Sequence, residues 1–188
     1  MIEGKFVNLR AREVSDAVRS ATWSGTPDMI RLMGDRYQAP LPAMELYLEE
    51  ELWGPSAYGE QLFAIETKDG RHIGNMGLSD VEQAQRRARI AIRIGEAEDR
   101  SKGYGADAMR TILRFAFQEM NLNRVELEVF EYNGRAIAAY KKCGFVEEAR
   151  LRLAHFSDAA FHDALIMAVL RSEFDAADAG SETEEVMR

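Results

Sequence analysis

The chain lacks the features that mark several broad classes of protein. Among its 188 residues there is one cysteine, Cys143, so no internal disulfide can form and a reducing compartment is expected. No apolar run approaches the roughly 20 residues that a membrane-spanning helix needs, and the first residues lack the charged-then-apolar form of a signal peptide. We therefore expect a cytoplasmic protein with no membrane partner.

Excess positive charge and clustered metal ligands are also missing. Lys and Arg number 24 against 32 for Asp and Glu, and the formal net charge of −8 argues against nucleic acid as a main partner. No cluster of His, Cys and Asp has the spacing of metal ligands, so no metal site is expected. The segment from Asp175 to Arg188 holds five acids and one base and almost no apolar residues. We predict one domain over residues 1–174 and a mobile acidic tail over 175–188.

The residues that are present alternate between strand and helix patterns, which predicts a mixed α/β domain with helices on both faces of a sheet. The sequence Lys68-Asp69-Gly70-Arg71 is a hairpin signal between two of the strands. Strands are predicted over 6–9, 61–67, 72–78, 88–94, 124–130, 148–156 and 161–170, and helices over 14–22, 29–33, 43–53, from about 104 to 120, and 135–142.

The most informative motif is Arg100-Ser101-Lys102-Gly103-Tyr104-Gly105, which lies between a predicted strand and a strongly amphipathic helix. Its glycines permit a sharp turn, and the helix N-terminus presents unpaired N–H groups and a positive dipole end, an arrangement that binds phosphate. A glycine-containing loop that only turns the chain is the alternative. A Rossmann unit could accept Ala108 at its third glycine position, but such a unit normally opens a domain, whereas this loop lies mid-chain. A P-loop needs a Gly-Lys-Ser/Thr ending, which the loop lacks.

A second motif follows the strand predicted over 124–130. Asn133 stands at the N-cap position of the next helix, and Tyr140 lies two helical turns later, on the same side. Gly144 is placed to end that helix in the left-handed conformation.

Together these motifs resemble the GCN5-related N-acetyltransferase (GNAT) superfamily. More narrowly, the chain is similar to the ribosomal-protein N-terminal acetyltransferase branch, which also holds polyamine and aminoglycoside acetyltransferases. The resemblance covers roughly residues 6 to 172, and the chain departs from the branch at Ser101, Asp107 and Ala160. The matching stretches are Arg100-x-x-Gly103-x-Gly105, Asn133…Ala136…Tyr140, Cys143-Gly144-Phe145, Gly103–Ala108, Phe115-Ala116-Phe117, Asn121–Val125, Phe161-His162-Asp163 and Ile166-Met167.

The resemblance implies a mostly antiparallel sheet of six to seven strands, with two central strands that splay apart near a bulge at Gly95. It implies acetyl-CoA as the acetyl donor, with the pyrophosphate held by the loop and the start of its helix. The pantetheine arm would lie along the strand that ends at Ile94, next to Asn133. The loop residues that it assigns to the cofactor are Arg100, Ser101, Lys102, Gly103, Tyr104, Gly105 and Ala106.

For the chemistry, the resemblance assigns Tyr140 as the general acid that protonates the CoA thiolate, against the alternative of a tyrosine that packs in the core. Glu128 is the candidate general base, against the alternative of a solvated strand-face glutamate beside Glu126. Cys143 is interpreted as a small apolar filler at the helix end rather than a catalytic thiol.

The function that follows is direct acetyl transfer from acetyl-CoA to a primary amine, and we expect a protein N-terminal amine as acceptor. A small polyamine or amino-sugar is the alternative acceptor, and a non-catalytic acyl-CoA-binding regulatory module is the alternative function. A homodimer is compatible with the sequence. The acceptor wall is expected to come from the first two helices and the last hairpin. Residues weighed for it, each with a solvated or structural alternative, are Glu45, Glu49, Glu50, Glu51, His155 and His162.

Overall fold

A computed structural model describes residues 1–34, 40–53 and 60–176. The side chains of Glu50 and Glu51, and nearly all of the predicted tail, lie outside the described residues. The last described residues, 171–176, are helical.

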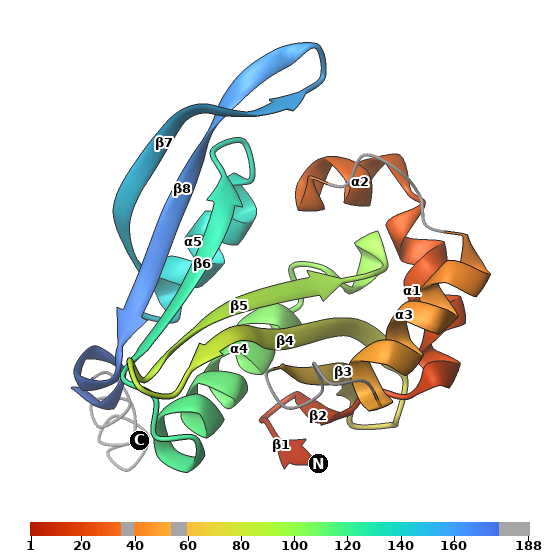
Figure 1. Cartoon of the computed structure of the whole chain (residues 1–188), viewed down its shortest axis with the longest axis horizontal. Coiled ribbons are helices and arrows are strands. Elements are labelled where there is room, and N and C mark those ends of the chain that lie inside the picture. Colours follow the sequence, from red (N-terminus) through yellow and green to blue (C-terminus); the bar gives the residue numbers. More distant parts are fainter. Residues whose placement is uncertain (35–39, 54–59, 177–188) are drawn as a thin grey trace.

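The chain forms a mixed α/β fold around one sheet of eight strands (Figure 1). All neighbouring strands are antiparallel except β5 and β6. The prediction of six to seven strands was wrong, because it did not include the short β1, which pairs with β2 across a tight turn. In spatial order the strands are β1 (Ile2–Glu3), β2 (Val7–Ala11), β3 (Gln61–Thr67), β4 (His72–Glu82), β5 (Arg87–Ile94), β6 (Arg124–Phe130), β8 (Ala160–Leu170) and β7 (Val146–Ser157).

That turn is held by Asp107, one of the positions at which the chain departs from the branch. Its carboxylate accepts the backbone N–H groups of Lys5, Phe6 and Val7 at 3.1, 2.7 and 2.9 Å. A Cβ on Gly4 would stand 2.7 Å from the same carboxylate, so a residue with a side chain does not fit at this position. The departure therefore has a structural role, which is to anchor the first strands to the helix that carries Asp107.

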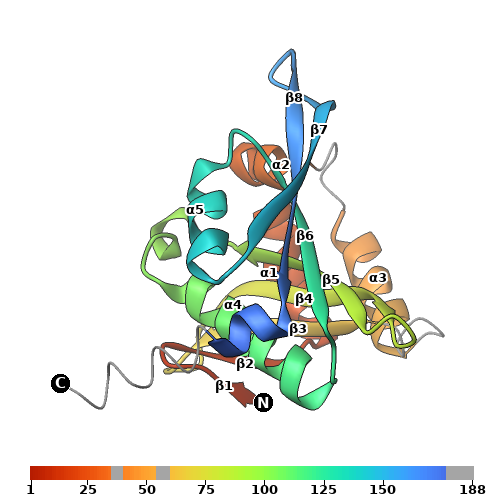
Figure 2. The same ribbon diagram turned by 90° about the vertical axis from the view of Figure 1, so that its left-hand side faces the viewer.

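Helices cover both faces of the sheet (Figures 1 and 2). On one face, α4 (Tyr104–Arg114) packs its apolar stripe into the core, where Met109, Ile112 and Leu113 are at most 1% exposed. α5 (Gly134–Lys142) packs against the same core cluster through Ala136, Ile137 and Tyr140. The remaining helices are α1 (Ala17–Ser24), α2 (Pro27–Met33) and α3 (Leu41–Trp53), of which α1 joins the opposite face through Ser20 and Asn75.

The helix predicted from about 104 to 120 changes character part-way. α4 ends at Arg114, and Phe115–Glu119 form a π-helical turn, with Met120 N–H bonded to the carbonyl of Phe115. This wider turn points two aromatic rings at separate partners, Phe115 at Phe63 and Phe117 at Phe174. Packing against these distant rings explains the departure from regular helix.

The two central strands splay apart, as predicted. β5 and β6 pair only at three positions, Arg87–Arg89 with Arg124–Glu126, and then diverge. An Arg89–Glu126 ion pair of 3.3 Å lies at the last paired position, the vertex of the opening. Gly95 does not carry the expected bulge: the register shift between β4 and β5 lies in β4, between Ser79 and Glu82. Gly95 instead makes room for Trp23, whose ring would be 2.1 Å from a Cβ there.

Candidate active site

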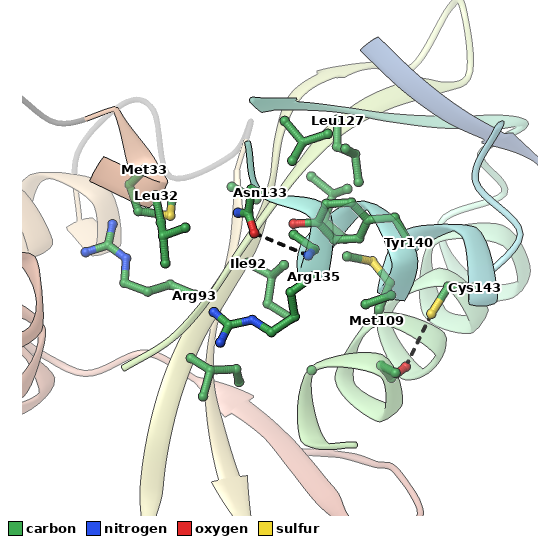
Figure 3. Close-up of a pocket in the computed structure, with 18 of the residues that line it drawn as sticks. Leu32, Met33, Ile92, Arg93, Met109, Leu127, Asn133, Arg135, Tyr140 and Cys143 are labelled. Atoms are coloured by element: carbon green, nitrogen blue, oxygen red, sulfur yellow. Dashed lines mark hydrogen bonds between the residues drawn. The ribbon is translucent and has the colours of Figure 1, made fainter. Parts of the chain in front are cut away.

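A cleft of about 720 Å³ fills the opening between β5 and β6. Its walls are the diverging ends of the two strands, the start of α4, one side of α5 and the apolar side of α2. Figure 3 shows Leu32 and Met33 on one side of this cleft and Asn133 and Tyr140 on the other. The site therefore joins segments that are about 100 residues apart in the sequence.

The predicted phosphate loop reaches the cleft at the start of α4. Gly103 is the N-cap residue with φ of 88°, and a Cβ there would meet no atom within 4 Å. The first N–H bonded within the helix is that of Asp107, to the carbonyl of Gly103, so the three N–H groups before it have no helical acceptor. This helix end supplies the N–H donors and dipole that a pyrophosphate needs.

The loop residues divide into two groups. Arg100, Ser101, Gly103, Gly105 and Ala106 line the cleft. Lys102 and Tyr104 do not; Tyr104 packs against the core instead. Cofactor contacts by all of these residues stay predictions.

Lys102 pairs with an acidic residue that itself lines the cleft. Its Nζ lies 3.4 Å from Asp99, a carboxylate that is 1% exposed. Arg71 binds Asp99 through two hydrogen bonds of 2.6 and 2.8 Å, and this pairing, helped by Lys102, lowers the Asp99 pKa.

The guanidinium of Arg100 already has protein partners. It donates to the carbonyls of Ile94 and Gly95 at 3.2 and 2.8 Å and pairs with Asp28 of α2. With 8% of the side chain exposed, Arg100 fixes the end of β5 and joins it to α2. Ile94 itself lines the cleft, as the predicted pantetheine strand requires.

Tyr140 lines the cleft from α5, and its ring also touches Phe145 at a centroid distance of 5.9 Å. Burial, with a smaller contribution from Cys143, raises the pKa of Tyr140 to about 12. The phenol is thus protonated at neutral pH, the form that a general acid requires. Burial also raises the pKa of the Cys143 thiol, which donates to the Ala106 carbonyl at 3.6 Å.

Asn133 is confirmed as the N-cap of α5. Its side-chain oxygen accepts the Ala136 N–H at 3.2 Å (Figure 3). The residue also lines the cleft, so capping and contact with the pantetheine arm are compatible.

Glu128 lies on the outward-facing side of β6 and lines the cleft. Two residues earlier on the same side, Glu126 is bound by Arg124 and Arg89, which lower its pKa against the effect of burial. Among the described residues, Glu128 has no hydrogen-bond or ion-pair partner. Its carboxylate is therefore available to a ligand.

Comparison with known proteins decides the family. The sequence profile of the acetyltransferase (GNAT) domain matches residues 7–146, which is most of the chain. The chain belongs to the GNAT acetyltransferase family. It is an acetyl-CoA-dependent N-acetyltransferase, so the alternative of a non-catalytic binding module is set aside.

Several relatives resemble this acetyltransferase over most of their length. Spermidine N(1)-acetyltransferase of Vibrio cholerae is 29% identical over 66% of this chain and 73% of its own. The L-amino acid N-acetyltransferase AaaT of Escherichia coli is 31% identical over 70% of this chain and 79% of its own. A crystal structure of the Vibrio cholerae spermidine enzyme with CoA and spermine has the same fold, with a TM-score of 0.82 at 24% identity over 89% and 97% of the two chains.

The acceptor wall was expected from the first two helices and the last hairpin, but three sets of residues that line the acetyltransferase cleft were not identified from the sequence. The apolar side of α2 contributes Met29, Leu32 and Met33, whose i, i+3, i+4 spacing was a usable signal. Asp80, at the bulge of β4 with φ of 50°, also lines the cleft. Arg135 is an exposed cation two residues after Asn133, and it lines the cleft as well.

Other candidates lie away from the cleft. Glu45, Glu49, His155 and His162 are not among its lining residues. His155 stacks on Phe130, which does line the cleft, at a centroid distance of 3.8 Å. No helix of the described residues could span a membrane, and no group of possible metal ligands occurs among them.

Proposed function

We propose that the acceptor of this acetyltransferase is a small cationic amine of the polyamine class. The observation that carries the proposal is a pair of carboxylates, Asp80 and Glu128, that line the cleft without an ionic partner among the described residues. An alkylammonium chain offers the charges that such carboxylates attract, with methylene groups between them.

The charge of the cleft supports this choice. Arg89 is paired with Glu126 and Arg100 with Asp28. Neither of these two arginines is therefore left to pair with Asp80 or Glu128, while Arg135 stands near the start of α5, where an anionic cofactor would gain from it.

The expected protein N-terminal acceptor is not supported to the same degree. The two relatives described above are named for spermidine and for L-amino acids, which are small amines. A protein N-terminus remains the alternative acceptor.

In the proposed reaction the predicted residues act in successive steps. Glu128, directly or through a water molecule, takes a proton from the ammonium group, and the neutral amine attacks the thioester carbonyl. A backbone N–H of the unpaired end of β5 would meet the oxyanion. When the C–S bond breaks, Tyr140 gives its proton to the CoA sulfur, and the attacking nitrogen releases its second proton to solvent, from which Tyr140 is reprotonated; the products are the acetylamide and CoA thiol.

The proposal is tested by CoA thiol release with acetyl-CoA and four acceptors: spermidine, an amino-sugar, an L-amino acid and a peptide with a free N-terminus. We expect the highest kcat/KM with spermidine, and a KM for spermidine that rises about tenfold in Asp80→Asn. Asp69→Asn, a carboxylate in the exposed turn after β3, is the matched control. A higher kcat/KM with the peptide would overturn the polyamine assignment.

A further inference from the structure

Helix α2 crosses the mouth of the cleft and is fastened on both sides. Figure 1 shows it between the end of β5 and the tip of the β7–β8 hairpin. On the β5 side, Asp28 pairs with Arg100. On the hairpin side, Arg31 Nε pairs with Asp158 at 2.6 Å. The helix thus connects the two arms that the splayed strands separate.

The two fastenings differ in exposure. Arg100 is 8% exposed and is also bound to two carbonyl groups, so this end has little freedom. Arg31 and Asp158 are 42% and 62% exposed, and water screens such a pair. The hairpin end is therefore the weaker of the two.

Tyr132, in the loop after β6, adds two contacts at the hairpin end. Its hydroxyl donates to the Arg31 carbonyl at 2.6 Å, and the Arg31 guanidinium lies 4.5 Å from the centre of its ring. Gly34, the C-cap of α2, approaches Phe130 so closely that a Cβ would stand 2.8 Å from the ring. Position and orientation of α2 are thus set by side chains of the β6 arm.

The turn between β7 and β8 determines the position of Asp158. Ser157 pairs with Ala160, so Asp158 and Ala159 form a two-residue turn, with φ of 51° and 61°. These values fit a type I′ turn, which matches the twist of the strands. Between this turn and α2 lies a hollow of about 270 Å³, so the ion pair bridges a gap that apolar packing does not fill.

We propose that Arg31 is a positioning residue for acceptor binding, because it fastens α2 to Asp158 and Tyr132 and so holds the apolar side of α2 as the acceptor wall. Met29, Leu32 and Met33 line the cleft from this helix. Releasing the hairpin end moves this wall, whereas the start of α4 and Tyr140 keep their places in other elements. The inference rests on the proposed function only in taking the α2 side of the cleft as the acceptor side.

Kinetic constants of Arg31→Gln and Asp158→Asn test the proposal. Asn tolerates the left-handed conformation, so the second variant removes the charge and keeps the turn. We expect the amine KM to rise about twofold to fivefold in Asp158→Asn and about threefold to tenfold in Arg31→Gln, which also loses the contact with the Tyr132 ring. The kcat and the KM for acetyl-CoA should stay within about twofold of the unmodified enzyme, since chemistry and donor site are on other elements.

The control is Glu82→Gln, which breaks an ion pair of similar exposure with Arg87, away from the cleft. Rescue is tested by Arg31→Lys, which keeps a cation opposite Asp158 and near the Tyr132 ring and should retain most of the amine affinity that Arg31→Gln loses. Amide hydrogen exchange over residues 27–33 should be faster in the two single variants than in the control.

The exchange measurement needs no acceptor, so it separates this inference from the polyamine assignment. If another amine proves to be the substrate, the KM comparison is made with that amine. Amine KM values and exchange over 27–33 that match those of Glu82→Gln would overturn the proposal. An equal rise in the KM for acetyl-CoA would also overturn it, since the effect would then extend beyond the acceptor wall.

Discussion

At the level of single side chains, the sharpest expectation concerns Tyr140. Its pKa of about 12 means that the phenol stays protonated as the pH rises, and loses its proton only near that value. Tyr140→Phe should lower kcat about 100-fold or more, while the KM for acetyl-CoA stays within about twofold, because the variant keeps the ring and removes the proton donor.

The pH dependence of kcat checks the same assignment. The enzyme should show no loss of activity from Tyr140 ionisation between pH 7 and about pH 10. Tyr132→Phe is the matched control for kcat alone, since it removes a hydroxyl that contacts α2, where the expected effect is on the amine KM. A kcat for Tyr140→Phe equal to that of the unmodified enzyme would contradict the role of general acid.

At the level of secondary-structure elements, a glycine of the phosphate loop can be compared with a glycine of the turn between β3 and β4. Gly103 and Gly70 have φ of 88° and 81°, and a Cβ on either would meet no atom within 4 Å. Gly103→Ala and Gly70→Ala should therefore each cost roughly 1 to 2 kcal/mol of unfolding free energy from backbone strain alone. Only Gly103→Ala should weaken acetyl-CoA binding, by about tenfold, because only Gly103 sets the direction of N–H groups at the start of α4.

Thermal unfolding and titration calorimetry with acetyl-CoA measure the two effects. If both variants lose acetyl-CoA affinity equally, general destabilisation is the cause rather than a change at the start of α4. If neither variant loses acetyl-CoA affinity, the start of α4 is not part of the cofactor site.

Most elements could be predicted from the sequence because their patterns are local. β3 and β6 occupy the predicted residues. In β6 the alternation of apolar and polar positions determines a strand that is buried on one side, and in β3 a short apolar run precedes a hairpin signal. The π-helical turn at Phe115–Glu119 could not be predicted, because its cause is contact with rings at Phe63 and Phe174.

The candidate site follows the same division. Asn133 and Tyr140 reach the cleft together because seven residues on one helix fix their relative direction. The partners of Arg100 and Arg31 are 72 and 127 residues away, at Asp28 and Asp158, and no local pattern contains them. For the same reason the sequence indicated the donor loop and the helices expected on the acceptor side, but not the ion pairs that join α2 to other elements.

At the level of the whole molecule, the splayed sheet places donor and acceptor in one continuous cleft. In the proposed arrangement the start of α4 and one side of α5 form the donor end, and α2 with the outward-facing side of β6 forms the acceptor end of the cleft that these elements line. The pKa of the Cys143 thiol, raised by burial, leaves no thiolate nucleophile there at neutral pH. Both substrates should therefore bind before the acetyl group moves directly from sulfur to nitrogen.

Initial velocities of CoA thiol release, with acetyl-CoA and spermidine varied against each other, test this most directly. A ternary complex predicts double-reciprocal lines that intersect, acetylated amine and CoA in equal amounts, and no acetylated enzyme by mass spectrometry. Parallel lines with an acetylated enzyme, or no acetylated amine with any acceptor tested, would contradict the account.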